Sequence, residues 1–476
     1  MAQRKAVIVG GGFAGITAAL ALHDAGRQVT LLEQGPYLGG RCSGLDDPTQ
    51  SIDVGHHMLF RGCSTTLRAL GRLGLNEAVR LQPSTALWFA RTEDGATAAL
   101  RSGRLEAPHH LVGSMLAFPF LDLKDKVRMR RVVQAMRDAD DASVEDLDEV
   151  DFGTWLRSFE QTERAIEAFW APLVKAGLNV HPDGASTAQA VLLFRATLFE
   201  DAQAYDAATF TMPLGHMMRE IEARLNSEGL EVRTSVDVTA VHRHDGAWHI
   251  SSSGSDVMAD DVVLAVGARA SAELAGASPD LKKHLVSLTG LKRSPRVAIH
   301  LFYSTSWPAM QPPFVFLVGP SPIDLIVHRS AELEAPDAGH WISVLCNDAS
   351  GAASMSDDAL TEEAMATIDR IWPREGTESP ARVEVVRSMD ATFASRPGAV
   401  TLRKGLMLNK EGMVFAGDWM WTGWPSSIEG ACRSGLQAAT DLIDDVGARP
   451  WDAWPAAPRR GDSGWPVWNV TAAQQP

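Results

Sequence analysis

The first 33 residues combine two short apolar runs with a glycine-rich turn. Residues 5–9 read KAVIV, four glycines fall within residues 10–15, and an apolar stretch of helical length then ends at Gly26. A second apolar run, VTLL, leads directly to Glu33. A strand, a turn, a helix and a second strand in this order predict a β-α-β unit with parallel strands.

The middle of the chain changes its pattern twice. Residues from about 80 to 112 are strand-rich, with a hairpin predicted around Asp94-Gly95. From 113 to 225 the apolar residues recur at helical spacing, as in FEQTERAIEAFWAPLVKAGLN. Asn179, followed by Pro182, marks the end of that helix.

Strands return after residue 228. The stretch 229–268 predicts a strand, a hairpin across Asp245-Gly246 and a buried strand that rejoins the first sheet. RVAIHLFY and HWISVLCN predict two strands of a second unit. Near the end, FAGDWMWTGWPSSIEGACRSGLQAA, residues 415–439, predicts a strand end, a Gly/Trp/Pro loop and a helix.

These patterns predict an α/β fold, in which a Rossmann-type domain is interrupted by an inserted α+β substrate domain. We assign residues 1–75, 226–275 and 405–448 to the Rossmann-type domain, 76–225 and 276–404 to the substrate domain, and 449–476 to a tail. The tail is rich in proline and tryptophan and lacks periodicity. It is expected to be extended or disordered, or to dock on the body through its four tryptophans.

Composition narrows the class of protein. The chain has 476 residues, 45% of them hydrophobic and 22% charged, which is typical of a globular protein. Its formal net charge of -15 argues against a nucleic-acid partner. The four cysteines form no CxxC pair, so no metal site or disulfide framework is predicted and a cytoplasmic protein is favoured. We find neither a signal peptide nor a run of about 18 uncharged apolar residues.

The glycine turn carries the first chemical signal. Gly10, Gly12 and Gly15 satisfy G-x-G-x-x-G between a strand and a helix. Gly10 would allow the tight turn, Gly12 the approach of a pyrophosphate, and Gly15 close packing of the helix on the strand. Phe13 and Ala14 open the helix, whose N-terminus attracts anions. The motif alone is weak, but its context predicts a dinucleotide site.

Two features after the second strand identify the dinucleotide further. Glu33 is placed to accept the ribose hydroxyls and would repel a 2′-phosphate, which favours FAD or NAD over NADP. The segment PYLGGRCSG then resembles the Gly-Gly-Arg signature of the amine oxidase and phytoene desaturase superfamily of flavoproteins. This resemblance implies FAD as the cofactor, with Gly39, Gly40 and Arg41 against its diphosphate.

The same resemblance implies further cofactor contacts. The backbone of Val236 corresponds to a position that contacts the adenine. Gly417 and Asp418 match the pair that meets the ribityl and pyrophosphate region, and Ser427 and Ile428 would present their backbone to the pyrimidine edge. The positive end of the following helix would stabilise anionic reduced flavin.

Longer stretches resemble one group within this superfamily, the squalene-associated FAD-dependent desaturases and hydroxysqualene dehydroxylases of hopanoid pathways. The stretches are SIDVGHHMLFRGC, FWAPLVKAGLNVHPDGAS, TLFEDAQAYDAATFTMPLGH, MDATFASRPGA and GDWMWTGWPSSIEGACRSG. One departure stands at 53–57, where relatives commonly read Asp-Asn-Gly-Gln-His and this chain reads DVGHH. The resemblance implies reductive removal of the hydroxyl of hydroxysqualene to give squalene.

Such a reaction requires an acid that helps water to leave. His56 and His57 are our candidates, because imidazole titrates near neutrality. Asp206 is a weaker candidate, with a surface or helix-capping role as its alternative. Arg61 could pair with an acid or contact the flavin. Trp421 and Trp424 could wall the flavin or the substrate pocket, or simply pack.

The implied substrate is a lipophilic isoprenoid dissolved in a membrane. Residues 109–137 place an apolar run beside a cluster of five cations, Lys124, Lys126, Arg128, Arg130 and Arg131. This composition fits either a helix that contacts the inner face of the membrane or an ordinary amphipathic helix over the substrate domain.

Other functions share the same cofactor cradle. In a carotenoid or phytoene desaturase, or in an amine oxidase, the substrate would donate hydride to the oxidised flavin. In the dehydroxylation, the reduced flavin donates hydride to the substrate. An amine oxidase needs an aromatic cage, and the chain has only three tyrosines for it unless tryptophans take their place. A lipid-binding protein that is merely stabilised by FAD is a third possibility.

Overall fold

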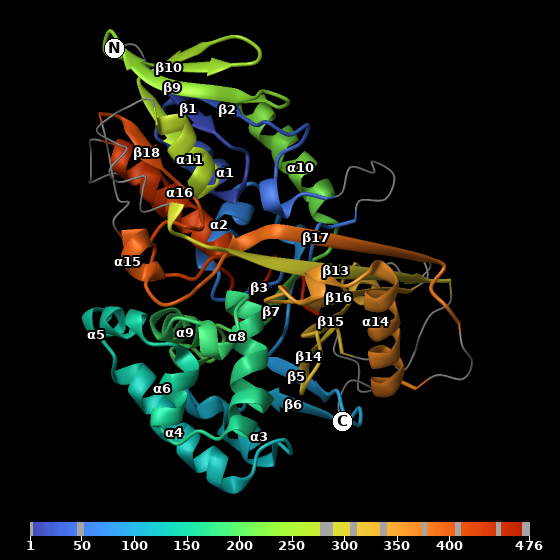
Figure 1. Cartoon of the computed structure of the whole chain (residues 1–476). Helices are drawn as coiled ribbons and strands as arrows, with labels where there is room; N and C mark the ends of the chain where they lie inside the picture. Colours follow the sequence, from blue (N-terminus) through green and yellow to red (C-terminus); the bar gives the residue numbers. More distant parts are fainter. Residues whose placement is uncertain are drawn as a thin grey trace.

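The computed structural model describes residues 3–44, 52–276, 289–304, 312–333, 340–373, 378–404, 411–443 and 449–468. The predicted domain limits at 405 and 448 lie outside these residues. The upper part of Figure 1 holds the predicted Rossmann-type part of the chain, and the helices between residues 112 and 194 of the inserted part lie at the lower left. The long strands β13 (Arg293–Tyr303) and β17 (Arg382–Phe393) cross the molecule between them (Figure 1).

A parallel sheet organises the first part. Its strands are ordered β18-β12-β1-β2-β8, and all four pairings are parallel. Their bounds are Met413–Phe415, Asp261–Leu264, Lys5–Val9, Gln28–Leu32 and Glu231–Arg233. After an exposed first residue, the central strands β1 and β2 are buried and almost entirely apolar, because both faces of a parallel sheet are covered. The predicted β-α-β unit and the predicted return of later strands to this sheet are confirmed.

Helices α1 (Phe13–Asp24), α16 (Ile428–Leu442), α2 (Ser64–Arg72) and α10 (Leu214–Ser227) share one core with this sheet. Helix α10 falls within the substrate domain by the predicted limits, yet it buries Met217 and Met218 in the same core as α1. Helix α11 (Ala268–Ala275) follows β12.

A three-stranded sheet, β11-β10-β9, adjoins the parallel sheet. Its strands are Val257–Ala259, Ala247–Ser252 and Val238–His244. Asp245 and Gly246 have φ angles of 50° and 82° and join β9 to β10. Two positive φ angles in succession match the right-handed twist of a hairpin, so the predicted turn is confirmed.

The inserted part is built on a seven-stranded sheet of order β17-β13-β16-β15-β14-β5-β6. The remaining strands of this sheet are His340–Cys346 (β16), Leu325–His328 (β15), Phe314–Val318 (β14), Ala86–Arg91 (β5) and Thr97–Arg101 (β6). The predicted strands at 296–303 and 340–347 and the hairpin around Asp94-Gly95 are confirmed. Helix α14 (Asp357–Ile371) contributes to the core on one side of the sheet.

A layer of helices contributes to the other core of this sheet. They are α3 (Val112–Ala117), α4 (Leu123–Asp138), α5 (Asp141–Asp146), α6 (Phe152–Ser158), α7 (Glu163–Ala165), α8 (Ala171–Leu178) and α9 (Thr187–Phe194). Asn179 ends α8 in the left-handed conformation, with φ of 55°, as predicted. The helical prediction for 113–225 is wrong at Ala207–Phe210, where four wholly buried residues form β7 between β3 (Leu59–Phe60) and β4 (Val79–Leu81).

The described part of the tail, 449–468, docks on the body, so the expectation of a disordered tail is wrong there, although most of it beyond Ala453 has no regular secondary structure. Trp451 and Trp454 are each 5% exposed and belong to the core around α1. The indole of Trp454 donates to Asp24 Oδ2 at 2.7 Å, and the backbone N–H of Trp468 donates to the Leu81 carbonyl at 3.0 Å. A tryptophan side chain offers a large apolar surface and one hydrogen-bond donor, the indole N–H. Both are used where the tail packs on the body.

Candidate functional site: a cofactor cradle and a buried charged cluster

The first glycine turn leaves room above α1. A Cβ on Gly10 would lie 2.6 Å from the Ala265 carbonyl oxygen, and one on Gly15 would lie 1.9 Å from the Gly10 carbonyl oxygen. Both positions therefore require glycine for packing within the protein. Gly12 differs, because a Cβ there would meet only the Gly39 carbonyl oxygen, at 4.0 Å. The space beside Gly12 lies at the N-terminus of α1, where backbone N–H groups lack intrahelical partners.

Glu33 follows β2 and connects three backbone segments. Its carboxylate oxygens accept hydrogen bonds from the N–H groups of Gly11 and Gly35, each at 2.7 Å. Its backbone carbonyl accepts from the N–H of Val236 at 2.9 Å. Glu33 and Val236, predicted to serve the ribose and the adenine, thus lie side by side at one end of the parallel sheet.

The second glycine turn faces the first. A Cβ on Gly40 would have the Cα of Gly12 as its nearest atom, at 3.8 Å. Arg41 forms an ion pair with Asp418, 377 residues further along the chain, and Ser426 also donates to Asp418. Burial acts to raise the pKa of Asp418, but the charge of Arg41 and these hydrogen bonds hold it below its usual value. Asp418 is therefore a carboxylate whose charge Arg41 compensates.

Helix α16 approaches α1 closely. A Cβ on Gly435 would lie 2.4 Å from the carbonyl oxygen of Ala14, so the two helices touch at the first turn of α1. Ser427 caps α16, with its Oγ accepting from the N–H of Gly430 at 3.1 Å, and Ile428 begins the helix. Gly417 donates its N–H to Ser434 Oγ at 2.8 Å, which ties the preceding loop to α16.

These features fit a dinucleotide. Two facing glycine turns leave backbone open to a pyrophosphate, a carboxylate closes one end, and a guanidinium lies at the other. Two helix N-termini add positive potential from distant parts of the chain. The residues predicted to bind the cofactor are thus gathered along one edge of the first domain.

A buried charged cluster lies behind residues 52–57. Arg329, in the short helix α13 (Arg329–Glu332), donates to Asp53 Oδ2 at 2.7 Å and also pairs with Glu332. His56 Nε2 is 3.7 Å from Glu332 Oε1, and neither His56 nitrogen has a hydrogen-bond partner. His57 points to different partners, with its Nε2 3.2 Å from the Arg41 carbonyl oxygen. His56 thus contacts the cluster, and His57 contacts the cofactor cradle.

The expectation that these histidines titrate near neutrality is wrong. Burial and the nearby cation of Arg329 hold the pKa of His56 well below its usual value. Burial and Arg296 lower the pKa of His57 to about 4. At neutral pH both rings are uncharged, because the interior and its arginines disfavour a further positive charge. Neither ring can then serve as a pre-formed imidazolium acid.

Glu332 was missed by the sequence-based prediction. Burial raises its pKa to about 7, although the charge of Arg329 opposes this shift. Glu332 and Arg329 are three residues apart, directly after the apolar strand LIVH. A charged pair at that spacing next to a fully buried strand is the only sequence signal that could have drawn attention to it.

Asp206 lies in a separate network. Its carboxylate accepts from Arg61 Nε at 2.9 Å, from Thr85 Oγ1 at 2.9 Å and from Arg460 Nε at 2.8 Å. Asp206 is completely buried, so the surface or helix-capping alternative is wrong. None of its described contacts involves His56, His57 or Arg41. The pairing of Arg61 with an acid is confirmed.

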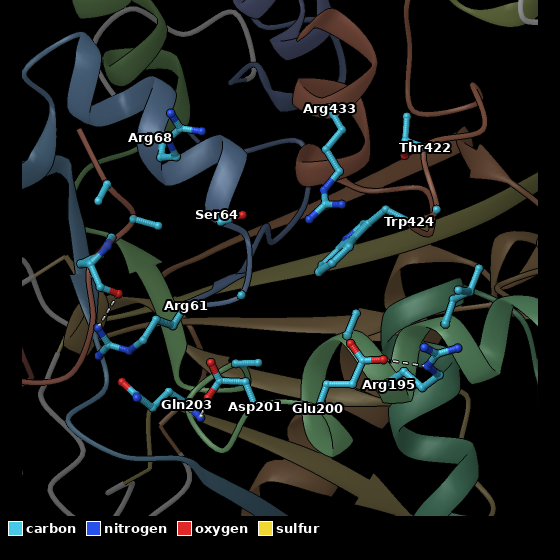
Figure 2. Close-up of a pocket in the computed structure, with 18 of the residues that line it drawn as sticks. Arg61, Ser64, Arg68, Arg195, Glu200, Asp201, Gln203, Thr422, Trp424 and Arg433 are labelled. Carbon is cyan, nitrogen blue, oxygen red and sulfur yellow. Dashed lines mark hydrogen bonds and ion pairs between the residues drawn. The ribbon is translucent and has the colours of Figure 1, made fainter. Parts of the chain in front are cut away.

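A cavity of about 990 Å³ opens beside the loop that precedes α16. The three predicted pocket residues, Arg61, Trp421 and Trp424, all line it. Figure 2 shows Trp424 and Arg433 extending side by side toward its interior, with the guanidinium 4.4 Å from the centre of the indole ring. Charged residues on the wall also include Arg68, Glu145, Arg195, Glu200, Asp201, Lys404, Asp452 and Arg459. The cavity is therefore strongly polar on several sides.

The parallel sheet with its paired glycine turns defines a dinucleotide-binding oxidoreductase. The chain belongs to the flavin containing amine oxidoreductase family, which matches residues 13–443. FAD is its cofactor, and the protein is a flavin-dependent oxidoreductase. Within the described residues, no group of three or more His, Cys, Asp or Glu is arranged to hold a metal ion. None of the helices described has the length and apolar character needed to cross a membrane.

Curated relatives cover nearly the whole chain at modest identity. A carotenoid phi-ring synthase of Streptomyces griseus is 26% identical over 96% of this chain and 90% of its own length. A hydroxysqualene dehydroxylase of Rhodopseudomonas palustris is also 26% identical, over 92% of this chain and 97% of its own length. A 15-cis-phytoene desaturase of Synechococcus elongatus is 21% identical over 92% of this chain and 96% of its own length.

Solved structures agree on the fold. An oxidoreductase from Methanosarcina mazei superposes with a TM-score of 0.70 at 16% identity, covering 91% of this chain and 99% of its own. Putrescine oxidase bound to putrescine superposes with a TM-score of 0.69 at 18% identity, covering 93% of this chain and 100% of its own. At such identities the likeness concerns the fold alone.

Proposed function

We propose that the protein acts on a long isoprenoid, and that its reaction is the reductive dehydroxylation of hydroxysqualene to squalene. The observation that carries this proposal is the end-to-end similarity to a hydroxysqualene dehydroxylase, over 97% of that protein's length. The stretches quoted from the sequence support it, because they are distributed from residue 51 to residue 435.

We assign the cofactor contacts as follows. The turn at Gly10, Gly12 and Gly15, with Phe13 and Ala14, would hold the pyrophosphate, and Glu33 and Val236 would hold the adenosine. The remaining contacts would come from Gly39, Gly40, Arg41, Gly417, Asp418, Ser427 and Ile428. The open space beside Gly12 and the pairing of Arg41 with Asp418 support this assignment.

Reduced FAD, when bound, supplies the two electrons and the hydrogen that replace the hydroxyl. The protein must orient the substrate, exclude water and provide a proton so that the hydroxyl leaves as water. The loop 418–427 contacts the cradle through Asp418 and the cavity through Trp421 and Trp424. The two indole rings give apolar surface to an otherwise charged wall, so they are the part of it suited to a lipophilic substrate.

Oxidative desaturation of a carotenoid is the second candidate. It is favoured by the similarity to carotenoid phi-ring synthase and to phytoene desaturase. Amine oxidation is less well supported, because the three tyrosines are dispersed. Tyr37 lies at the surface beside Arg219, Tyr205 packs on Phe60, and Tyr303 is buried in the core next to α14.

We also propose that the protein contacts a membrane surface through α3 and α4. Five of the nine large hydrophobic side chains exposed in the described residues fall in this region: Leu105, Val112, Leu116, Leu123 and Val127. Lys126 donates to the Leu116 carbonyl at 2.8 Å and so joins α4 to the end of α3. Lys124 and Arg130 are exposed and form no ion pair with any carboxylate in the part of the chain that the structure describes, which leaves them available to anionic lipid.

An anaerobic single-turnover experiment tests the reaction. The purified holoenzyme would be reduced stoichiometrically and mixed with hydroxysqualene in detergent, and both flavin absorbance and squalene would be followed. We expect one squalene per flavin reoxidised. The proposal fails if the reduced enzyme leaves hydroxysqualene unchanged while the oxidised enzyme is bleached by phytoene or ζ-carotene, which would establish the desaturase instead.

A further inference from the structure

We propose that Glu332 and His56 form a buried pair that holds one exchangeable proton for the flavin reaction, with Glu332 acting through His56. The inference rests on the proposed function for the direction of transfer. Glu332 is a positioning residue in this scheme, since it lies behind His56 and not in the cradle.

The geometry of the pair is unusual for a protein interior. Glu332 is 1% exposed and His56 is 6% exposed. Glu332 Oε1 has no hydrogen-bond partner, and neither does either nitrogen of His56, while Oε1 and Nε2 are 3.7 Å apart. Buried polar atoms are nearly always paired, so two unpaired atoms that face each other, Oε1 and Nε2, indicate that a proton or a ligand group completes the pair. A small side-chain movement would close the gap to a hydrogen bond.

The surroundings explain why the pair can hold a proton at neutral pH. Arg329 is shared between Glu332 and Asp53, so its single charge compensates two carboxylates. The groups that face the pair are Arg329 from α13, Asp53 and His57 from the segment 52–57, and Arg296 and His300 from β13. When Glu332 is protonated it carries no charge, and the positive charge of Arg329 is then balanced by the negative charge of Asp53 alone. Burial raises the pKa of Glu332 to about 7, which agrees with this distribution.

The pair lies beside a residue of the cofactor cradle. His56 precedes His57 in the chain, and His57 Nε2 lies 3.2 Å from the Arg41 carbonyl oxygen. Since His56 is uncharged at neutral pH, it can accept a proton from Glu332 at one nitrogen and donate one from the other. Glu332 therefore sets the proton supply, and His56 carries it.

The overall step balances. The hydroxyl oxygen of the substrate takes the proton held by the pair, the C–O bond breaks, and water leaves. Reduced flavin, when bound, would supply a hydride to that carbon, so that the substrate is reduced and the flavin is oxidised. The Glu332 carboxylate then regains a proton from solvent before the next turnover. If the reaction is instead a desaturation, the substrate would lose a hydride to oxidised flavin and a proton to the Glu332–His56 pair.

Infrared difference spectroscopy of the oxidised holoenzyme tests the proton-holding property without a substrate. We expect a carboxylic acid C=O band that disappears as the pH rises through about 7, and its absence in Glu332→Gln. The control is Glu429→Gln, which removes another fully buried glutamate, one already bonded to Thr65, Thr66 and Arg433. The inference is overturned if the band survives in Glu332→Gln or if only Glu429→Gln removes it.

Single-turnover reoxidation of the reduced flavin by substrate tests the use of that proton. In the wild type the rate should fall about tenfold per pH unit above about 7, whereas Glu332→Gln should be about 100-fold slower with no such dependence. If Glu332→Gln retains FAD and has an unchanged KM, its slower rate comes from the lost proton supply and not from misfolding. An unchanged pH profile in Glu332→Gln overturns the inference. If wild-type enzyme turns over phytoene instead of hydroxysqualene, the proposed function fails, but the infrared test and the pH profile with phytoene still decide the role of the pair.

Discussion

Arg403 lies beneath the loop that leads into α16, and its Nη2 donates to the Met420 carbonyl oxygen at 2.7 Å. The same guanidinium also donates to the carbonyl oxygens of Asp418, Trp419 and Trp424. Burial lowers the pKa of Arg403 to about 10, so it stays charged at neutral pH. One buried cation in α15 (Ala399–Lys404) therefore holds the backbone of the whole loop.

Replacement of Arg403 by lysine should loosen this loop. A lysine ammonium is a compact charge and cannot reproduce the planar set of donors, so several carbonyls lose their partner. We expect Arg403→Lys to lower the free energy of unfolding by about 3 kcal/mol and to weaken FAD retention. Chemical denaturation and flavin absorbance after gel filtration measure the two effects. Arg293→Lys, at an exposed ion pair with Asp390, should change neither.

The sequence correctly predicted those parts of the fold that depend only on residues close together in the chain. The β-α-β unit, the turn at Asp245-Gly246 and the end of α8 at Asn179 each follow from a few adjacent side chains. The strand at Ala207–Phe210 was missed because its partners β3 and β4 lie more than a hundred residues earlier in the chain. Pairing across such distances is determined by tertiary packing and leaves no local periodicity.

Gly12→Ala separates the needs of the cofactor from those of the fold. A Cβ at Gly12 meets no protein atom closer than 4.0 Å, so the apoprotein should fold with unchanged stability. The methyl group would occupy the space assigned to the pyrophosphate and push it away from the backbone donors. We expect FAD affinity to fall by about 10- to 100-fold, since each charge-assisted hydrogen bond contributes about 1.5–3 kcal/mol. Fluorescence titration of apoprotein with FAD measures this change.

Two other glycines serve as references for that experiment. Gly10→Ala places a Cβ 2.6 Å from the Ala265 carbonyl oxygen at a residue with φ of 107°, so it should destabilise the apoprotein itself. Gly113→Ala, in α3, meets nothing within 4 Å and should be neutral in both assays. Equal FAD affinity in Gly12→Ala and the wild type would show that the pyrophosphate does not bind at this turn.

Asp206→Asn should affect stability and leave the flavin unchanged. The substitution removes the charge that compensates Arg61 and Arg460, and breaking a buried ion pair costs about 3–5 kcal/mol. We expect a correspondingly lower midpoint in urea, with the same flavin spectrum and the same FAD affinity. Asp201→Asn, at an exposed carboxylate that accepts only from the Gln203 N–H among the contacts described, should behave like the wild type. A loss of turnover without a loss of stability would instead make Asp206 catalytic.

The charged cluster at Glu332 shows where sequence reasoning reaches its limit. Arg329 and Asp53 are 276 residues apart, so their ion pair could not be foreseen from either segment. The choice of His56 and His57 as acids used their ordinary pKa values, and burial beside two arginines lowers both. The same burial raises the pKa of the neighbouring carboxyl of Glu332. Residue type alone therefore gave the wrong pKa for both histidines, because burial disfavours the charged form of each group.

The membrane proposal predicts that the exposed side chains of α3 and α4 determine binding to vesicles. Leu116 and Leu123 are 58% and 68% exposed, and transfer of each side chain into lipid should contribute about 1.5–3 kcal/mol. Leu116→Glu with Leu123→Glu should lower co-sedimentation with anionic phospholipid vesicles at least about tenfold. Lys124→Glu should reduce binding about fivefold at low salt and less at high salt, because lipid charge is screened.

Control variants distinguish a specific surface from general hydrophobic adhesion. Met258 and Met389 are 55% and 58% exposed but lie on strands β11 and β17, far in sequence from α3 and α4. Their replacement by glutamate adds the same negative charges to the protein, so it should leave vesicle binding nearly unchanged. If the methionine and leucine variants lose binding equally, net charge and not α3 and α4 controls it. Binding of the wild type to neutral and anionic vesicles with equal strength would likewise exclude a role for the exposed lysine and arginine side chains.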